Sequence, residues 1–225
     1  MAQGGRLIVL DGAEGVGKST QIRRLAEHLE RRGERVLLVR EPGGTAVGEA
    51  IRTLLLDPGG ELGAVGETLL FLASRAELVE RVIAPALVRG ETVLADRFFL
   101  STYAYQGAAR GLDLEQVRAA NRFATGGLVP DLTILLHLPV ARGLERAAVR
   151  GGHDRMERVG GDFHERVQRA FEAFLDPAWQ AAHCECGRIV GTSGEGGEVE
   201  VFERVLAAMR ERWPETFSPR AESHQ

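Results

Sequence analysis

The sequence Gly12-Ala13-Glu14-Gly15-Val16-Gly17-Lys18-Ser19 decides the fold of this chain. It matches the phosphate-binding pattern G-x-x-x-x-G-K-[ST], and it lies between an apolar run at residues 7–10 and a segment of helical periodicity, as that pattern requires. Glycines let backbone N–H groups turn toward phosphate oxygens, and the following helix adds the positive end of its dipole. These residues, together with Thr20, are therefore predicted to bind the phosphates of a nucleoside triphosphate.

Lys18 is the only lysine among the 28 basic residues of the chain. A compact ammonium on a flexible stem reaches the outer phosphates of a nucleotide, whereas the planar guanidinium of arginine is a poor substitute there. The Ser19 hydroxyl is expected to ligate the Mg²⁺ that accompanies the triphosphate, and Asp96, which ends another apolar run, could hold the same ion through water.

Short apolar runs alternate with helical segments along the chain. The runs that predict strands are residues 7–10, 36–39, 92–95, 133–138 and 188–190; the segments that predict helices are 19–32, 47–56, 67–88, 114–124, 140–150, 163–182 and 199–212. This order predicts an α/β fold of the P-loop NTPase type, with five mostly parallel strands and helices on both faces of the sheet. Asp113 is expected to begin a helix, Gly33 and Gly90 to end helices, and Pro177 to kink or break one.

Composition narrows the class of protein further. The 225 residues are 44% hydrophobic and 27% charged with a net charge of −4, which is typical of one globular domain and argues against a surface built for nucleic acid or an anionic membrane. No apolar run approaches a membrane span, and no signal peptide is expected. The two cysteines, Cys184 and Cys186, are too close and too few for a disulfide framework or a zinc site, so a reducing cytoplasm is predicted.

Several spaced motifs carry a resemblance to a known family. They are Asp96-Arg97, then Ser101-Thr102-Tyr103-Ala104-Tyr105-Gln106-Gly107, with Arg40-Glu41-Pro42-Gly43-Gly44-Thr45, Leu69-Leu70-Phe71-Leu72-Ala73-Ser74-Arg75 and Pro130-Asp131-Leu132-Thr133 in addition. In their order along the chain, over about residues 7–212, these motifs resemble the bacterial thymidylate kinases. The resemblance implies transfer of the γ-phosphate of ATP to dTMP, giving ADP and dTDP for dTTP synthesis, with Mg²⁺ as cofactor and a homodimer as the assembly.

Residues of the acceptor site are expected from these motifs. Phe71 and Arg75 share a helix face, so a ring and a guanidinium can approach one planar base, and the resemblance implies that they bind thymine. It further implies that Tyr105 crowds the ribose 2′ position and that Gln106 holds the base or sugar, with Ser101 and Thr102 in the same substrate-binding segment. Arg97 and Arg40 are expected to hold the acceptor phosphate.

Glu14 is an unusual residue for a phosphate loop, because bound phosphates repel a carboxylate that faces nothing else. We expect it to point toward the acceptor nucleotide, and the resemblance implies a contact with the acceptor sugar or its bound arginine.

Residues 150–161 are predicted to form a lid, because paired glycines flank an arginine-rich centre. The resemblance implies a catalytic arginine in this lid when the phosphate loop lacks one, so Arg150, Arg155 or both are assigned that role. The whole of residues 1–213 is expected to form one kinase domain, with 214–225 a frayed tail.

Two other functions remain open at this point. One is a kinase of another nucleoside monophosphate or of a nucleoside; the other, from a different class, is a nucleotide-dependent switch, for which Asp57 begins a loose D-x-x-G. A guanine-reading Asn-Lys-x-Asp is impossible, because Asn121 is the only asparagine and Arg122 follows it. At His137 the family pattern has an acidic residue, and this histidine is expected to be structural.

Overall fold

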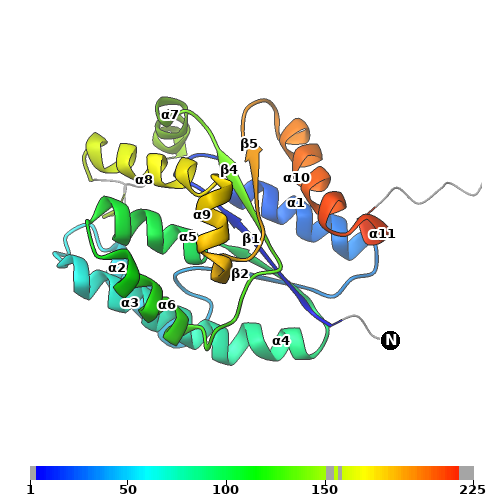
Figure 1. Cartoon of the computed structure of the whole chain (residues 1–225), viewed down its shortest axis with the longest axis horizontal. Helices are drawn as coiled ribbons and strands as arrows, with labels where there is room; N and C mark the ends of the chain where they lie inside the picture. The colour runs from blue at the N-terminus through cyan, green and yellow to red at the C-terminus, as the bar shows by residue number, and fades with distance from the viewer. Residues whose placement is uncertain (1–3, 151–154, 157–158, 218–225) are drawn as a thin grey trace, which may run out of the picture.

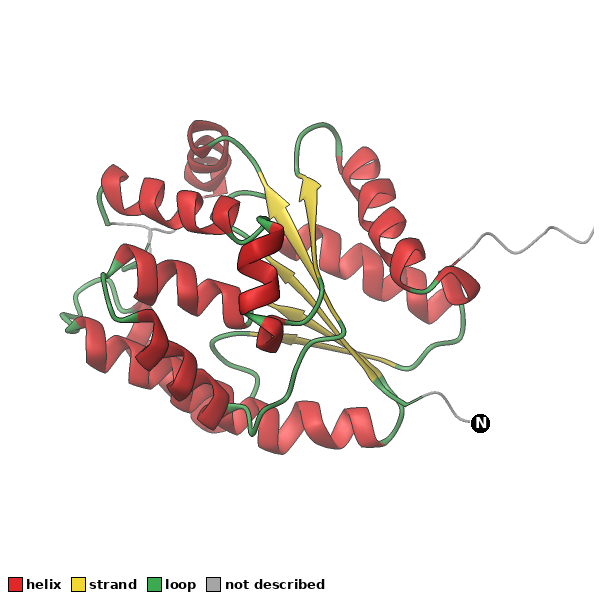
Figure 2. Ribbon diagram, in the orientation of Figure 1, coloured by secondary structure: helices red, strands yellow, loops and turns green. Residues whose placement is uncertain are grey.

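The computed structural model describes residues 4–150, 155–156 and 159–217 (Figure 1). At its centre lies a sheet of five strands, drawn as arrows in Figure 2: β1 (Arg6–Asp11), β2 (Val36–Arg40), β3 (Thr92–Asp96), β4 (Leu132–His137) and β5 (Ile189–Ser193). The strand order is β2-β3-β1-β4-β5, and all neighbouring strands are parallel. The predicted α/β fold with a five-stranded sheet is confirmed, and the sheet is parallel throughout.

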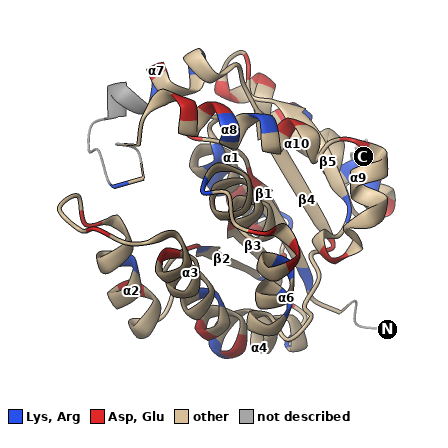
Figure 3. Cartoon of the chain, turned by 60° about the vertical axis from the view of Figure 1, so that its left-hand side comes forward, with Lys and Arg blue, Asp and Glu red and all other residues tan. Residues whose placement is uncertain are grey.

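Helices connect these strands and cover both faces of the sheet. They are α1 (Lys18–Arg31), α2 (Ala46–Leu56), α3 (Ala64–Leu78), α4 (Ala84–Val88), α5 (Phe99–Thr102), α6 (Leu114–Ala124), α7 (Val140–Arg150), α8 (Gly161–Ala173), α9 (Pro177–Ala182), α10 (Glu198–Arg212) and α11 (Pro214–Phe217), with two π-helical segments, η1 (Val79–Ile83) and η2 (Tyr103–Ala109), and a 3₁₀ turn, η3 (Cys184–Cys186). Among the described residues, no helix has both the length and the apolar character needed to span a membrane. Acidic and basic residues are interspersed along these helices in the view of Figure 3.

Side-chain alternation along β1 divides the core into two halves. Leu7 and Val9 pack into one cluster with the helices between β2 and β4 and with α8 and α9. Ile8 and Leu10 pack into the other cluster, against α1 and α10. In Figure 1, α1, α10 and α11 lie on one side of the sheet, and α2 to α6 with α8 and α9 on the other. Both faces of the inner strands β1, β3 and β4 are therefore buried, which explains why their sequences are mostly apolar.

The register of the sheet places the functional segments together. Leu10 of β1 pairs with Asp96 of β3, and Arg40 of β2 also pairs with Asp96. The loops that leave these three strands therefore emerge at the same edge, which is where ligands bind in parallel α/β sheets.

Two prolines modify the predicted helices. The segment predicted at 67–88 begins at Ala64 and contains η1 just before Pro85, where a wider turn relieves the clash between a proline ring and the preceding carbonyl groups. The segment predicted at 163–182 divides into α8 and α9, and the predicted break at Pro177 is confirmed. Asp113 caps α6 by accepting a hydrogen bond from the backbone N–H of Gln116 at 2.9 Å, as expected.

The sequence analysis missed one helical segment and placed one boundary too early. Residues 99–109 form α5 and η2, although Tyr, Thr and Gly favour helices only weakly, because nearly every side chain of the segment is buried in the core. The expected frayed tail does not begin at Pro214, since Pro214–Phe217 form α11 and Phe217 is buried in the core around α10. Residues 218–225 lie outside the described part of the chain.

Candidate active site

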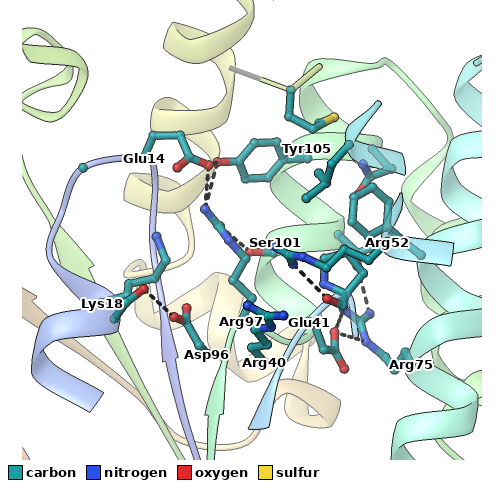
Figure 4. Close-up of a pocket in the computed structure, with 18 of the residues that line it drawn as sticks. Glu14, Lys18, Arg40, Glu41, Arg52, Arg75, Asp96, Arg97, Ser101 and Tyr105 are labelled. Carbon is teal, nitrogen blue, oxygen red and sulfur yellow. Dashed lines mark hydrogen bonds and ion pairs between the residues drawn. The ribbon is translucent and has the colours of Figure 1, made fainter. Parts of the chain in front are cut away.

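A pocket of about 290 Å³ lies at the edge where β1, β2 and β3 end (Figure 4). Its wall combines part of the phosphate loop with residues of the acceptor-site motifs. The lining residues are Glu14, Gly15, Gly17, Lys18, Ser19, Arg40, Glu41, Pro42, Arg52, Leu56, Phe71, Arg75, Asp96, Arg97, Ser101, Thr102, Tyr105, Gln106 and Met156. The structure therefore brings together most of the residues predicted to hold the two substrates, from segments far apart in the sequence.

The phosphate loop curls around its own lysine. Lys18 Nζ donates hydrogen bonds to the carbonyl oxygens of Gly12 at 3.0 Å and Ala13 at 2.7 Å. Burial, with a smaller contribution from the nearby Arg97, lowers the pKa of Lys18 to about 8. A partly desolvated cation held by carbonyl groups is ready to exchange them for phosphate oxygens.

Glycines make the loop conformation possible. Gly12, Gly15 and Gly17 have φ angles of 139°, 71° and 98°, in the region that side chains disfavour. At Gly15 an added Cβ would also lie 1.8 Å from the carbonyl oxygen of Gly143 in α7, so only glycine fits there. Gly17 precedes α1, whose first turn carries Lys18, Ser19 and Thr20.

Ser19 and Asp96 meet across the gap between α1 and β3. The Ser19 hydroxyl donates a hydrogen bond to Asp96 Oδ2 at 2.7 Å, and both residues line the pocket. Hydroxyl and carboxylate oxygens are the donors that Mg²⁺ prefers, so the pair predicted as a metal site is chemically suited to that ion.

Arg97 connects the phosphate loop to the segment after β3. It has a φ of 74°, the only positive φ of a non-glycine residue in the described chain, and its guanidinium donates to the Gly12 carbonyl at 3.0 Å and to Ser101 Oγ at 2.8 Å. Strained backbone of this kind persists only where the surrounding contacts hold it, and such residues cluster at functional sites.

The Glu14 carboxylate faces Arg97 and Tyr105. Glu14 Oε1 accepts hydrogen bonds from Arg97 Nη2 at 2.7 Å and from the Tyr105 hydroxyl at 3.0 Å, as Figure 4 shows. Burial raises the pKa of the Tyr105 hydroxyl, so the phenol stays protonated and donates this bond. Arg97 and Tyr105 both line the pocket, so the Glu14 carboxylate faces groups of the pocket wall.

Asp11 supports this arrangement, and the sequence analysis missed it. The Asp11 side chain is fully buried. Its Oδ1 accepts hydrogen bonds from the Gly12 N–H at 2.9 Å and from the Ser101 hydroxyl at 2.7 Å. Its Oδ2 accepts hydrogen bonds from the backbone N–H groups of Phe98 at 3.2 Å and Ser101 at 3.0 Å. It thereby fixes the phosphate loop to the start of α5. An acidic residue at the end of an otherwise apolar strand, directly before Gly12, was the available signal.

Arg75 and Phe71 lie on α3 at the opposite end of the pocket from Lys18. Phe71 is half-buried, whereas Arg75 is only 2% exposed. All five donors of the Arg75 guanidinium are engaged: two with Glu41 Oε2, one with the Phe98 carbonyl at 2.9 Å, one with Thr102 Oγ1 at 2.8 Å and one with Asn121 Oδ1. Any contact between Arg75 and a base therefore requires one of these bonds to open.

Arg155 of the expected lid does not lie over the phosphate loop. Arg155 donates to Glu67 Oε2 at 2.7 Å and to the Leu55 carbonyl at 2.9 Å, on α3 and α2, and it does not line the pocket, although the adjacent Met156 does. Arg150 ends α7, but its side chain lies outside the described part of the chain, as do residues 151–154 and 157–158 of the expected lid.

The remaining predicted positions have ordinary structural surroundings. Arg40 is exposed, lines the pocket and forms an ion pair with Glu49 at 3.3 Å. His137 is half-buried at the end of β4, and its carbonyl accepts from the Gly194 N–H at 2.9 Å. Cys184 is exposed and Cys186 is buried.

A family model for thymidylate kinase matches residues 10–182. The chain belongs to the thymidylate kinase family. A thymidylate kinase of Deinococcus radiodurans is 47% identical over 208 residues, which cover 92% of this chain and 98% of that protein. A thymidylate kinase of Desulforudis audaxviator is 51% identical over 214 residues, covering 92% and 93% of the two chains.

A solved structure agrees with this membership. The crystal structure of thymidylate kinase from Ehrlichia chaffeensis superposes with a TM-score of 0.71 at 27% identity, covering 92% of this chain and 99% of that one. The thymidylate kinase resemblance inferred from the motifs is therefore confirmed. These relatives support a kinase and not the nucleotide-dependent switch considered as an alternative.

Proposed function

We propose that the pocket at the ends of β1, β2 and β3 is the site where this chain, as a thymidylate kinase, transfers the γ-phosphate of ATP to dTMP and forms ADP and dTDP. The observation that carries the proposal is the position of Arg97, whose guanidinium bonds to the phosphate loop through Gly12 and to the acceptor-side segment through Ser101. A cation at that junction lies between a phosphate-binding loop and a cavity with an aromatic wall. Transfer between two bound phosphates needs positive charge at this junction.

On the donor side, Lys18 and the backbone N–H groups of residues 12–20 hold the phosphates of ATP. Ser19 and Asp96 hold Mg²⁺, which supplies charge neutralisation of the phosphate oxygens when it is bound. The protein contributes position, because the reaction is an in-line displacement without a covalent enzyme intermediate.

On the acceptor side, Arg97 and Arg40 hold the phosphate of dTMP. Phe71 stacks on the thymine ring, and Arg75 reads its edge after releasing one of its present partners. Tyr105, held by Glu14, fills the space beside the sugar carbon that carries no hydroxyl in a deoxynucleotide. Ser101, Thr102 and Gln106 complete this wall of the pocket.

Arginines of residues 150–161 stabilise the charge of the transition state. For Arg155 this role requires the guanidinium to leave Glu67 Oε2 and the Leu55 carbonyl and to approach the phosphates. An arginine of this kind contributes about 10³-fold or more to the rate of phosphoryl transfer.

The chain acts as a homodimer in the cytoplasm, with one kinase domain that includes α11 and ends no earlier than Phe217. Support for the dimer comes from large apolar side chains exposed on two adjacent helices: Val65 and Leu69 on α3 are 62% and 59% exposed, and Phe123 on α6 is 91% exposed. Apolar groups gathered on one face favour a contact with a second copy.

Steady-state kinetics of two variants test the assignment of the two halves of the pocket. Lys18→Ala should lower kcat/KM for ATP, and Arg97→Gln should lower kcat/KM for dTMP by at least about 100-fold, the scale of one lost transition-state donor. Arg89→Gln, which removes an exposed arginine paired with Glu91 far from the pocket, is the matched control and should leave both constants unchanged. Equal effects of Arg97→Gln and Arg89→Gln on dTMP would contradict the proposal.

A further inference from the structure

Glu67 is a buried carboxylate that touches the substrate pocket only through other residues. It lies on α3, is 0% exposed and does not line the pocket. Its oxygens accept four hydrogen bonds: Oε1 from Gln106 Nε2 at 2.9 Å and Arg110 Nε at 3.2 Å, and Oε2 from Arg110 Nη2 at 2.9 Å and Arg155 Nη1 at 2.7 Å. The mechanism described above gives this residue no role.

The charge state of Glu67 follows from these partners. Burial by itself would raise its pKa, but the hydrogen bonds from Arg110, Gln106 and Arg155 outweigh that effect and hold the pKa below its ordinary value. The carboxylate is therefore ionised at neutral pH, and an ionised carboxylate only accepts hydrogen bonds.

An ionised Glu67 determines which way the amide of Gln106 points. The two ends of a glutamine amide have almost the same shape, but only the NH₂ end can face a carboxylate, because an amide oxygen at 2.9 Å would be repelled. The amide oxygen must then point away from Glu67. Gln106 is 2% exposed, it lines the pocket, and none of the described residues donates a hydrogen bond to its amide oxygen.

We infer that Glu67 is a positioning residue, which holds the Gln106 amide with its oxygen facing the acceptor nucleotide and thereby makes the pocket select a base with an N–H group at ring position 3. The inference rests on the proposed placement of the base beside Phe71 and Gln106. Thymine carries a hydrogen at N3 and can donate to the amide oxygen, whereas cytosine carries a lone pair there, so that two acceptors would face each other. Glu67 thus acts on the choice of substrate through Gln106, without touching the substrate.

The test measures the ratio of kcat/KM for dTMP to kcat/KM for dCMP. In Glu67→Gln the new amide can either accept or donate, so the Gln106 amide is free to rotate and to present its NH₂ group to cytosine. The ratio should fall by about 10-fold, the scale of one hydrogen bond, mainly through the dCMP arm. Far-UV circular dichroism establishes that each variant is folded.

Two further variants separate positioning from a general structural role. Gln106→Leu removes the amide and should lower the same ratio, and Glu67→Gln in the Gln106→Leu background should lower it no further, since residues that act through one another are not additive. Arg110→Gln is the matched control: it removes one charged partner of Glu67, but the new amide can still donate to the carboxylate and the bond from Gln106 stays, wherever Arg155 lies. The ratio should therefore stay within about twofold of the wild type.

A charge-conserving swap provides the rescue. In Glu67→Gln/Gln106→Glu, residue 106 has only oxygen acceptors, so an acceptor faces the pocket whatever the orientation at residue 67, and most of the lost discrimination should return. The swap gives the same information where Glu67→Gln alone folds in low yield.

The outcomes distinguish the inference from the proposed base site. If Gln106→Leu leaves the ratio unchanged, Gln106 does not read the base, and both the base placement and the inference fail. If Gln106→Leu lowers the ratio but Glu67→Gln does not, the base site stands and the role of Glu67 is refuted. Equal losses for dTMP and dCMP in Glu67→Gln would likewise show a merely structural carboxylate.

Discussion

Removal of the Glu41 side chain should destabilise the fold much more than removal of an acid whose arginine partner is exposed to solvent. Glu41 and Arg75 form an ion pair in which the side chains are only 4% and 2% exposed, and Glu41 Oε2 accepts from Arg75 Nε at 2.8 Å. Glu41→Leu leaves two guanidinium donors and a positive charge in the core without compensation. Breaking a buried pair in this way costs about 3–5 kcal/mol.

The magnitude can be followed in two assays. In a domain of this size each kcal/mol shifts Tm by about 2–4 °C, so Glu41→Leu should lower Tm by roughly 6–20 °C. Urea unfolding followed by circular dichroism gives the same quantity as a free energy. Glu91→Leu is the comparison variant, because the Arg89–Glu91 pair also has a 2.8 Å contact but its side chains are 53% and 17% exposed. Its loss should therefore lower Tm much less than Glu41→Leu does.

A second variant tests the physical reason. Arg75→Met combined with Glu41→Leu removes the buried charge together with its partner, so the double variant should cost less than the sum of the two single variants by about 1–3 kcal/mol. Strict additivity, or a cost of Glu41→Leu no larger than that of Glu91→Leu, would refute the argument that Arg75 depends on Glu41 for its burial.

Three other predictions follow from the structure. Lys18 has a pKa of about 8 and binds phosphate only when it is protonated. The value of kcat/KM for ATP should therefore be constant below pH 8 and fall about tenfold per pH unit above it. A pH profile that stays flat well above pH 8 would contradict this role of Lys18. Gly15→Ala should abolish ATP binding in calorimetry, because the added Cβ would lie 1.8 Å from a carbonyl oxygen of α7; retained binding would show that the loop can shift. Gly66→Ala on α3 is the comparison variant: the position has open space, so the change should leave binding intact and stabilise the fold by up to about 1 kcal/mol. Phe123→Asp should dissociate the proposed dimer in light scattering, whereas Val88→Asp, at a side chain 89% exposed on α4, should not; a dimer that survives Phe123→Asp places the interface elsewhere.

The parts of the site that lie in one contiguous stretch could be predicted from the sequence. The phosphate loop is a single motif between a strand and a helix, and its lysine, glycines and serine occupy the expected places. The contact between Ser19 and Asp96 could also be expected, although 77 residues separate them, because both lie at the same edge of a parallel sheet.

The buried acids could not be assigned in the same way. Asp11 and Ser101 are 90 residues apart, and Glu67 and Arg155 are 88 apart, so their pairing depends on how α3, α5 and the residues before α8 pack. Helical periodicity shows which face of α3 is apolar but not that a charged residue on it meets two arginines from elsewhere. For the same reason the segment 99–109 was missed: its helix is stabilised by tertiary contacts, including the Asp11 carboxylate, rather than by its own propensity.

The position of Arg155 illustrates a second limit. Paired glycines and arginines predict a segment that can move over bound phosphates, but they do not show which residues its side chains contact. In the structure Arg155 is held by Glu67 and Leu55.

Formation of ADP from ATP and Mg²⁺ by the purified chain, alone and with each of dTMP, dUMP, dCMP, dGMP and dAMP, tests the central claim most directly. The account predicts strong stimulation by dTMP, weaker stimulation by the other four, and loss of all activity in Lys18→Ala. Acceptor-independent hydrolysis, or equal rates with all five monophosphates, would contradict it.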